Sequence, residues 1–300
     1  MTPTVLILSH PDDAHVGAVR AHLDRAGARA LVLDTADLGT GRGTVTARVR
    51  GGTLAGDIAG CDLGDVGCVW HRRPSEFTAG DADDAAELRS GIGGVLAGLP
   101  HLNHPADMAV AGFKPYQLDV AARCGLAVPD TIITTDATRA AEMASAYGGA
   151  VVVKPMSRRV GGLVRDGDRA GWSRVIHLTQ KRIAAVAHVR LTMVDGTPYA
   201  AEITSPHLDW RTDLSRCAYR VVETPDGVAE ATCRLLAALR LRFGVMDFAV
   251  DGDRRWWFLE LNPNGQWLWI EHVTGLPIAA AIASALRSPP VAGTGRRRAA

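Results

Sequence analysis

The first third of the chain alternates short apolar runs with amphipathic stretches. Val5 to Leu8 is apolar throughout, Asp13 to Ala26 repeats apolar positions at helical spacing, and a second mostly apolar run, Ala30 to Asp34, follows the Gly27 stop. A strand, a helix and a strand in this order predict a βαβ unit and therefore a parallel sheet. The continuous apolar run from Val66 to Trp70 predicts a further strand of that sheet, buried on both faces.

Two more elements complete this segment. Thr44 to Arg50 alternates polar and apolar residues, which predicts an exposed edge strand. Residues 82–99 predict a helix, although its glycines weaken helix formation. Pro100 and Pro105 bracket the string HLNH, so we place a boundary near residue 105.

From residue 106 the pattern changes to a compact α+β segment. Two helices come first, and a strand at Thr131 to Thr134, a helix at Ala137 to Tyr147 and the apolar run Ala150 to Pro155 follow. The string SRRVGGLV after that run predicts a loop.

The remaining residues predict a second α+β unit built mainly from antiparallel strands. Its strands are expected near 175–179, 186–194, 198–205, 245–250 and 256–261, and its helices near 225–239 and 277–286. The fold class is therefore mixed α/β and α+β. The predicted division is a parallel-sheet segment at 1–105, α+β segments at 106–180 and 181–287, and a disordered tail at 288–300 whose arginines form a solvated charge run.

The charge balance excludes binding through a broad charged surface. The chain has 33 Lys and Arg against 32 Asp and Glu, a net charge of +1, which argues against a nucleic-acid or acidic-membrane partner. It has no apolar run of membrane-spanning length, and its N-terminus lacks the basic start of a signal peptide. Its 5 cysteines are scattered without CxxC spacing, which suggests neither a disulfide framework nor a zinc knuckle. We therefore expect a cytoplasmic protein with reduced thiols.

Lysine is rare in this chain, which has only Lys114, Lys154 and Lys181 among its 33 basic residues. Lys154 ends an apolar strand beside a Gly-containing loop, a place that suits a phosphate contact, although such a lysine is usually just solvated. Lys114 starts a helix and Lys181 follows a strand, so a helix cap or a surface charge also explains them. Gln180 to Ile183 fits a hinge between the two α+β units, with backbone groups free to read an adenine edge.

Oxygen-bearing side chains converge near the C-terminus. Asp247 lies on one predicted strand and Glu260 and Asn262 on the next, with the turn at Asp251 to Asp253 between them. Residues two apart point to the same face of a strand, so the three side chains are expected to meet. Two carboxylates and an amide suit Mg²⁺, which fills its coordination sphere with water and nucleotide phosphates. The alternative is a solvated hairpin with incidental acids, but the apolar flanks make an unpaired buried acid costly there.

Together these residues resemble the ATP-grasp ligases over nearly the whole chain. The resemblance depends on Lys114 before a helix, Lys154 after an apolar strand, the string QKRI and the D…E-x-N carboxylate set. More specifically, the chain resembles ATP-grasp ribosomal-peptide maturases of the microviridin and graspetide type. The strings that carry this are VWHRRP, HLNHP, KPYQLDVAARCGLAVPDT, LTQKRI, LDWR and FLELNPNGQWLWIEHVTGLPI.

The resemblance implies an ATP-grasp fold, with an N-terminal parallel-sheet domain and two α+β subdomains that clasp ATP and Mg²⁺. It assigns phosphate contacts to two lysines, the adenine pocket to the hinge, Mg²⁺ to the oxygen donors, and the phosphoryl group or substrate carboxylate to two arginines. In the same order these residues are Lys114 and Lys154; Gln180, Lys181, Arg182 and Ile183; Asp247, Glu260 and Asn262; and Arg190 and Arg211. His188 stands where an acidic residue is expected.

Two more arginines follow the predicted strand at Val66 to Trp70. Ligands of α/β sheets bind beyond the carboxyl ends of the strands. Arg72 and Arg73 are therefore predicted to face the active site and attract acidic side chains of a peptide. Ion pairing with a nearby Asp or Glu is the alternative.

The activity that the resemblance implies is an ATP-dependent macrocyclisation of a ribosomal precursor peptide, which binds through a leader. A side-chain carboxylate attacks the γ-phosphate of ATP, and a Ser or Thr hydroxyl or a Lys amine then displaces phosphate from the acylphosphate. The products are an ω-ester or ω-amide ring, ADP and phosphate. The resemblance is also compatible with a homodimer.

Three other functions compete with this one. An ATP-grasp ligase for small amino-acid substrates, of the RimK type, would share the nucleotide site. A nucleotide-binding scaffold without ligase activity is the second. A zinc-dependent LmbE-like deacetylase is the third, because HPDDAH at His10 to His15 and HLNH at His101 to His104 offer zinc ligands. Ala14 stands where that family has Glu, and Asp12 or Asp13 as a helix N-cap explains the segment more simply.

Overall fold

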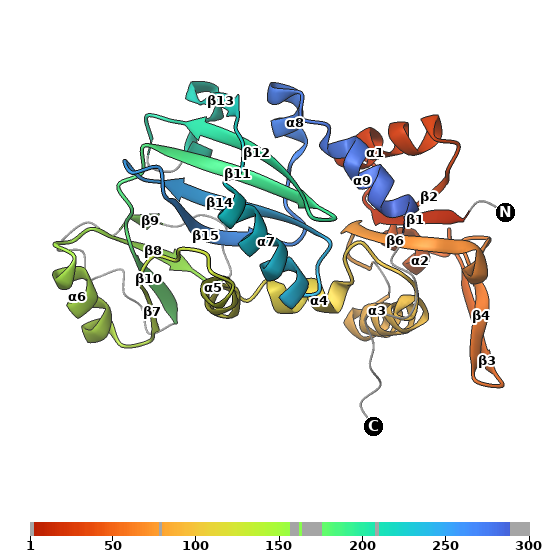
Figure 1. Ribbon diagram of the computed structural model, residues 1–300. Coiled ribbons are helices and arrows are strands. Elements are labelled where there is room, and N and C mark those ends of the chain that lie inside the picture. The colour runs from red at the N-terminus through yellow and green to blue at the C-terminus, as the bar shows by residue number, and fades with distance from the viewer. Residues whose placement is uncertain (1–2, 78–79, 157–161, 164–175, 208–209, 289–300) are drawn as a thin grey trace.

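The computed structural model describes residues 3–77, 80–156, 162–163, 176–207 and 210–288, and Figure 1 shows their arrangement. The predicted tail from residue 289 onward and most of the predicted SRRVGGLV loop lie outside these residues. None of the described helices is both long and apolar enough to span a membrane.

The N-terminal sheet is parallel, as predicted. Its order is β2-β1-β6, with β1 at Thr4–Ser9, β2 at Arg29–Leu33 and β6 at Val66–Arg73. Helix α1 (Ala14–Arg25) makes the crossover, and its N-cap Asp13 accepts a hydrogen bond from the His15 N–H, so the N-cap interpretation of Asp13 is confirmed.

Both faces of this sheet are covered, as the apolar runs require. Val5 and Ile7 share one core with Val19 of α1 and with Ile282 and Leu286 of the closing helix α9 (Ile278–Arg287). On the other face α3 (Ala82–Leu96) packs with α2 (Thr35–Gly39), which the sequence did not predict. The chain therefore returns at its C-terminal end to the sheet with which it begins (Figure 1).

A small antiparallel sheet projects beside the parallel one (Figure 1). It consists of β3 (Val45–Arg50), β4 (Thr53–Ile58) and β5 (Cys61–Asp62), followed by the 3₁₀ turn η1 (Leu63–Asp65). β3 is an edge strand as predicted, but it is exposed along almost its whole length, so its alternation marks no buried face.

The middle segment follows the prediction except in its last two strands, because Gly162–Leu163 was predicted to be in a loop and the strand near 175–179 was predicted to belong to the second α+β unit. Helices α4 (Pro105–Ala111) and α5 (Lys114–Arg123) lead to an antiparallel sheet of order β7-β10-β8-β9. Its elements are β7 (Thr131–Thr134), α6 (Ala137–Ala146), β8 (Val151–Pro155), β9 (Gly162–Leu163) and β10 (His177–Lys181). β10 includes Gln180 and Lys181, because its pairing with β7 and β8 continues through the predicted hinge.

The largest sheet of the described chain is antiparallel and carries the carboxylates. Its order is β13-β12-β11-β14-β15, with β11 at Ala187–Val194, β12 at Thr197–Thr204, β13 at Ala218–Val221, β14 at Phe243–Val250 and β15 at Trp256–Asn262. Helices α5 and α7 (Asp226–Ala238) pack on one face. The 3₁₀ turn η3 (Trp210–Thr212) and helix α8 (Leu268–Thr274) pack on the other face, and η4 (Leu214–Arg216) follows η3. β13 and α8 were not predicted.

The closing helix bears on the predicted division of the chain. α9 was assigned to the 181–287 segment, and it packs on α1 and β6 of the N-terminal sheet. The boundaries at residues 105, 180 and 287 stay predictions.

Candidate active site

Two carboxylates face each other on the central hairpin. β14 and β15 pair antiparallel, with Asp247 opposite Glu260 and Val245 opposite Asn262. The register shifts directly after Asp247, so the hairpin is locally irregular at this pair. Asp247 is only 4% exposed, which makes an unpaired charge there very costly.

Two arginines neutralise this pair. Arg190 lies opposite Asp247 on the neighbouring strand β11, and its Nη1 donates to Asp247 Oδ1 at 2.8 Å. Arg211 Nη2 donates to Asp247 Oδ2 and, at 3.0 Å, to Glu260 Oε1. Its guanidinium also lies over the Trp210 ring, 4.7 Å from the centroid. Arg211 therefore bridges both carboxylates.

The two carboxyl groups respond differently to this field. Burial raises the pKa of Asp247, but the charges of Arg190 and Arg211 outweigh it and lower the pKa to about 2. Burial and the Asp247 charge raise the pKa of Glu260 against the opposing effects of Arg211, Lys114 and Lys154. Glu260 therefore carries its proton to higher pH than an ordinary glutamate does.

Both predicted phosphate lysines lie at this cluster. Lys114, the first residue of α5, places Nζ 3.8 Å from Glu260 Oε2. Lys154 on β8 donates from Nζ to Gln180 Oε1 at 2.9 Å. Burial lowers the pKa of Lys154 because it disfavours the charged ammonium, a cost that an anionic partner would offset.

A cavity of about 580 Å³ opens beside Glu260 and Arg211. The candidate residues that line it come from α5, β11, η3 and β15: Lys114, Arg190, Arg211, Glu260 and Asn262. The structure therefore gathers in one cavity five side chains that the sequence had predicted to act together, with Asp247 paired to two of them.

The predicted adenine segment makes more hydrogen bonds within the protein than expected. Gln180 is buried, and its Nε2 donates to Thr131 Oγ1 at 2.9 Å while its Oε1 accepts from Lys154. The backbone N–H groups of Lys181 and Arg182 donate to Asp130 O and Ala150 O. These two N–H groups were expected to be free, and the structure corrects that, because the β10 ladder and its flanks use them.

Lys181 and Ile183 differ from the rest of that segment. The Lys181 ammonium lies over the Tyr147 ring, 5.1 Å from the centroid, and Ile183 is half-buried beyond the end of β10. The adenine contact of this segment stays a prediction.

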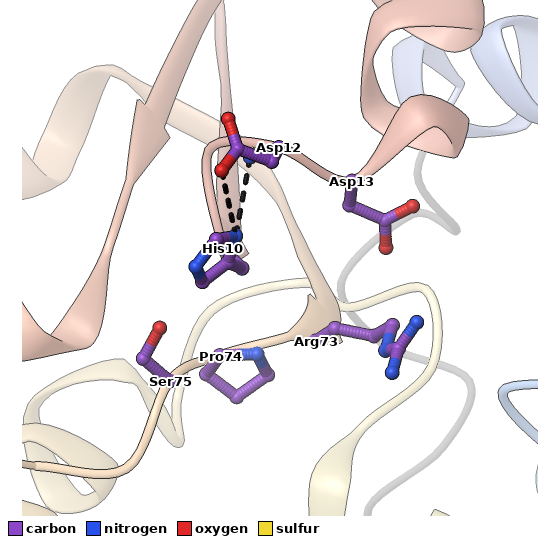
Figure 2. Close-up of a pocket in the computed structure, with 6 residues that line it drawn as sticks. All are labelled: His10, Asp12, Asp13, Arg73, Pro74 and Ser75. Carbon is purple, nitrogen blue, oxygen red and sulfur yellow. Dashed lines mark hydrogen bonds and ion pairs between the residues drawn. The ribbon is translucent and has the colours of Figure 1, made fainter.

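Arg72 and Arg73 differ in burial and in partners, although they are neighbours in the sequence. The Arg72 side chain is 1% exposed and forms an ion pair with Asp13, so the structure favours the ion-pair alternative and not a substrate contact. Arg73 is exposed and lines a second cavity of about 320 Å³. Figure 2 shows His10 turned back onto Asp12 at one side of this cavity, with Arg73 and Asp13 at the other.

The histidine strings that suggested zinc serve other contacts. His15 Nδ1 lies 2.8 Å from Asp13 Oδ1, and its Nε2 faces the backbone N–H groups of Trp267 and Leu268. Among the described residues there is no cluster of three or more His, Cys, Asp and Glu side chains placed to hold a metal ion. His188, at the position where an acid was expected, is half-buried on β11.

The donor set at the hairpin fits Mg²⁺ bound together with a nucleotide. Two carboxylates and the Asn262 amide supply hard oxygen ligands without closing a cage, which leaves room for water and phosphate oxygens. Lys114 and Lys154 supply the cations that phosphates need. Asp247, Glu260 and Asn262 would hold the metal, and the lysines would contact the phosphates.

Three residues of this region were missed in the sequence. Gln117 on α5 is 2% exposed and hydrogen-bonds to both backbone groups of Leu261. Asn103 binds Pro263 O, and Gln266 O accepts from Arg190 Nη2 at 2.7 Å. All three lie inside strings used for the resemblance, but hydrogen bonds between a side chain and a distant backbone group carry no spacing signal of their own.

Comparison with known proteins supports the assignment of the fold. No family profile and no curated protein matches the chain. Among solved structures, macrocyclase MdnC of Microcystis aeruginosa, bound to its precursor peptide MdnA, has 25% identity and a TM-score of 0.81 over 95% of this chain and 99% of that one.

Two further structures show the same fold. A Chryseobacterium gregarium RiPP-associated ATP-grasp ligase, in complex with ADP and a leader and core peptide, has 21% identity and a TM-score of 0.83 over 96% of this chain and 98% of that one. ATP-grasp ligase PsnB, complexed with minimal precursor, Mg and ADP, has 23% identity and a TM-score of 0.80 over 95% and 96%. The chain has the ATP-grasp fold, and its predicted resemblance to ATP-grasp ribosomal-peptide maturases is confirmed.

Proposed function

We propose that this protein is an ATP- and Mg²⁺-dependent ligase that macrocyclises a ribosomally made precursor peptide through side-chain ester or amide bonds. The observation that carries the proposal is the charge cluster in one cavity of an ATP-grasp fold, where Arg211 bridges Asp247 and Glu260, and Lys114 lies against Glu260. The three similar structures are enzymes associated with ribosomal peptides. This similarity favours a peptide substrate over the small amino acids of RimK-type ligases.

Activation is the first chemical step. A carboxylate oxygen of an Asp or Glu side chain in the peptide attacks the γ-phosphorus of ATP, the bond to the β-phosphate oxygen breaks, and ADP leaves. Charge develops on the transferred group, and Lys114, Arg190 and Arg211 line the cavity and are suited to receive it. Mg²⁺ bound at Asp247, Glu260 and Asn262 would neutralise further phosphate charge.

Ring closure is the second step. A Ser or Thr hydroxyl or a Lys amine of the same peptide attacks the acyl carbon, loses its proton, and displaces phosphate. The peptide loses one water for each ring. No nucleophile of the enzyme is needed, so the role of the site is to hold ATP and the peptide carboxylate together and away from water.

The peptide is expected to be acidic near its reacting residues. Arg73 is exposed beside the cavity of Figure 2 and is suited to attract such carboxylates. Binding of a leader segment, a homodimer and a cytoplasmic location stay predictions, and the cytoplasm supplies the ATP that the reaction consumes.

The proposal is tested by incubating the protein with ATP, Mg²⁺ and the peptide of a neighbouring short gene rich in Thr, Ser, Asp and Glu. Mass spectrometry should show the loss of one water per ring with stoichiometric ADP release, and Asp247→Ala or Glu260→Ala should abolish both. Peptide of unchanged or increased mass would refute macrocyclisation. ADP release that depends on free glutamate would indicate a small-substrate ligase, and Mg·ADP binding without any turnover would indicate a scaffold.

A further inference from the structure

The segment Leu261–Leu268, here called the anchored segment, joins strand β15 to helix α8 and contains Asn262. Its backbone groups are bound one after another by polar side chains from distant parts of the chain. The anchors, in the order of the groups they bind, are Gln117 at Leu261, Asn103 at Pro263, Arg72 at Asn264 and Gly265, Arg190 at Gln266, and His15 at Trp267 and Leu268.

Arg72 makes the densest contact of this set. Its Nη1 donates to Asn264 O and Asn264 Oδ1 at 3.0 Å and to Gly265 O at 3.2 Å. The Asn264 amide donates back to Arg72 O, so the two residues are bound in both directions. The Arg72 Nε donates to Asp13 Oδ2 at 3.1 Å, and the side chains of Arg72 and Asp13 are almost fully buried. Asp13 therefore fixes the guanidinium that holds the segment.

His15 continues this arrangement by one residue. Its Nδ1 pairs with the other Asp13 oxygen, Oδ1, at 2.8 Å, which leaves Nε2 to accept from the N–H groups of Trp267 and Leu268, each at 3.4 Å. Its ring meets the buried Trp267 ring edge-on, 5.1 Å between centroids. One carboxylate thus orients two anchors at once.

Asn103 secures the segment from another side. It is 3% exposed, and its Nδ2 donates to Pro263 O at 3.0 Å and to Phe243 O at 2.7 Å. Its Oδ1 accepts from the N–H groups of Arg242 and Phe243. The amide therefore ties the anchored segment to the start of β14, the strand that carries Asp247.

The anchored segment is hydrogen-bonded to two residues of the proposed nucleotide site. The Asn264 N–H donates to Asn262 Oδ1 at 3.2 Å and so orients the candidate metal ligand. Gln266 O accepts from Arg190 Nη2, whose Nη1 binds Asp247. A shift of the segment would move Asn262 and Arg190 together.

We propose that four side chains outside the nucleotide cavity position Asn262 and Arg190 through the anchored segment: Asp13, His15, Arg72 and Asn103. This inference rests on the proposed function, which identifies the ligand at Asn262 as Mg²⁺ bound together with a nucleotide. It gives a role to Asp13 and His15 of the string HPDDAH and to Asn103 of HLNH, as hydrogen-bonding anchors from the N-terminal part of the chain. Supporting residues behind a metal ligand commonly change metal affinity by about 10- to 100-fold when they are replaced.

The test uses the full chain with the double substitution Asp13→Asn and Arg72→Met, which removes both buried charges together and leaves a side chain able to cap α1. His15→Leu, a smaller change, is the second variant. Amide hydrogen exchange without nucleotide should be about tenfold faster within residues 261–268 than in the unmodified protein. The Mg²⁺ concentration for half-maximal ADP binding, measured by calorimetry, should rise about tenfold.

Arg242→Met is the matched control. Its guanidinium also binds a carboxylate, Asp195, and two carbonyls, Ala285 O and Ser288 O, but at the end of α9. It should speed exchange near residues 278–288 and leave the Mg²⁺ requirement unchanged.

The possible outcomes test the anchoring of the segment and the positioning of Asn262 and Arg190 separately. Unchanged exchange at 261–268 in both variants would overturn the anchoring, and faster exchange with an unchanged Mg²⁺ requirement would overturn the positioning role. An equal rise in the Mg²⁺ requirement for Arg242→Met would show a general loss of stability instead. If the unmodified protein binds no Mg·ADP, the proposed function fails and the positioning role with it, while the exchange rates still decide the anchoring.

Discussion

Asp247 and Glu260 lie directly opposite each other on β14 and β15, and the pKa of one is lowered while that of the other is raised. Like charges opposite each other destabilise a sheet, and Arg211 offsets this by binding both carboxylates. A divalent cation at the pair would take over that role. Under the proposed function, a metal ion and the Arg211 guanidinium would therefore compete for the same two carboxylates.

Asp247→Asn should nearly abolish ring formation. The substitution keeps the shape but removes the charge that Arg190 and Arg211 share, so phosphates and metal lose their fixed geometry. We expect peptide-dependent ADP release to fall by about 10²–10³-fold, the cost of removing one fixed charge-stabilising group. Asp251→Asn, at the turn of the same hairpin, is the control and should keep nearly full turnover. Retained turnover in Asp247→Asn would exclude this carboxylate from the site.

Arg211→Met should separate metal binding from catalysis. Without the guanidinium, the two carboxylates lose the cation that competes with a metal, so Mn²⁺ should bind several-fold more tightly in the absence of nucleotide, as measured by electron paramagnetic resonance. Ring formation should fall at the same time, because the transferred phosphoryl group loses a donor. Weaker Mn²⁺ binding would mean that Arg211 supports the metal site and does not compete with it.

Lys154 should make nucleotide affinity depend on pH. Burial holds its pKa below the ordinary 10.5, so the free site loses the ammonium at a lower pH than a solvated lysine does. Affinity for ADP should therefore begin to fall below pH 10.5 as the pH rises, by up to about tenfold per unit above the lowered pKa. Lys154→Arg keeps its charge throughout and should show a flat profile in the same calorimetric series. A parallel fall in both proteins would assign the titration to another group.

The sequence predicted which candidate residues lie together better than it predicted the contacts that hold them. Period-two spacing puts Glu260 and Asn262 on one face of a strand, and the hairpin brings Asp247 to the neighbouring strand. The structure places Asp247 opposite Glu260 through a register shift directly after Asp247, which the spacing does not predict. The parallel sheet likewise follows from apolar runs buried on both faces. These features are local, so a pattern of neighbouring residues contains them.

The errors concern groups whose partners are far away along the chain. Arg72 was expected to reach a substrate, but it is bound by Asn264, 192 residues further on. Gln180 was expected in a hinge, but pairing of β10 with β7 and β8 extends the strand through it. Helix α8 was missed because a helix of 7 residues has too few turns for a periodic signal.

Gly265→Ala should damage the site from within the anchored segment. A Cβ at this position would lie 2.5 Å from Val245 Cβ and 2.8 Å from Val245 Cγ2, and Val245 is a buried residue on β14. The segment must then shift away from the sheet, and Arg72 loses its alignment with Gly265 O. We expect a loss of about 1–3 kcal/mol in the free energy of unfolding, measured with urea, together with a higher Mg²⁺ requirement for ADP binding.

Gly252→Ala is the matched control, because a Cβ in the turn between β14 and β15 meets no atom within 4 Å. It should change stability by less than about 0.5 kcal/mol. Equal stability of the two variants would show that the segment tolerates displacement, and an unchanged Mg²⁺ requirement in a destabilised Gly265→Ala would show that the nucleotide site does not depend on it.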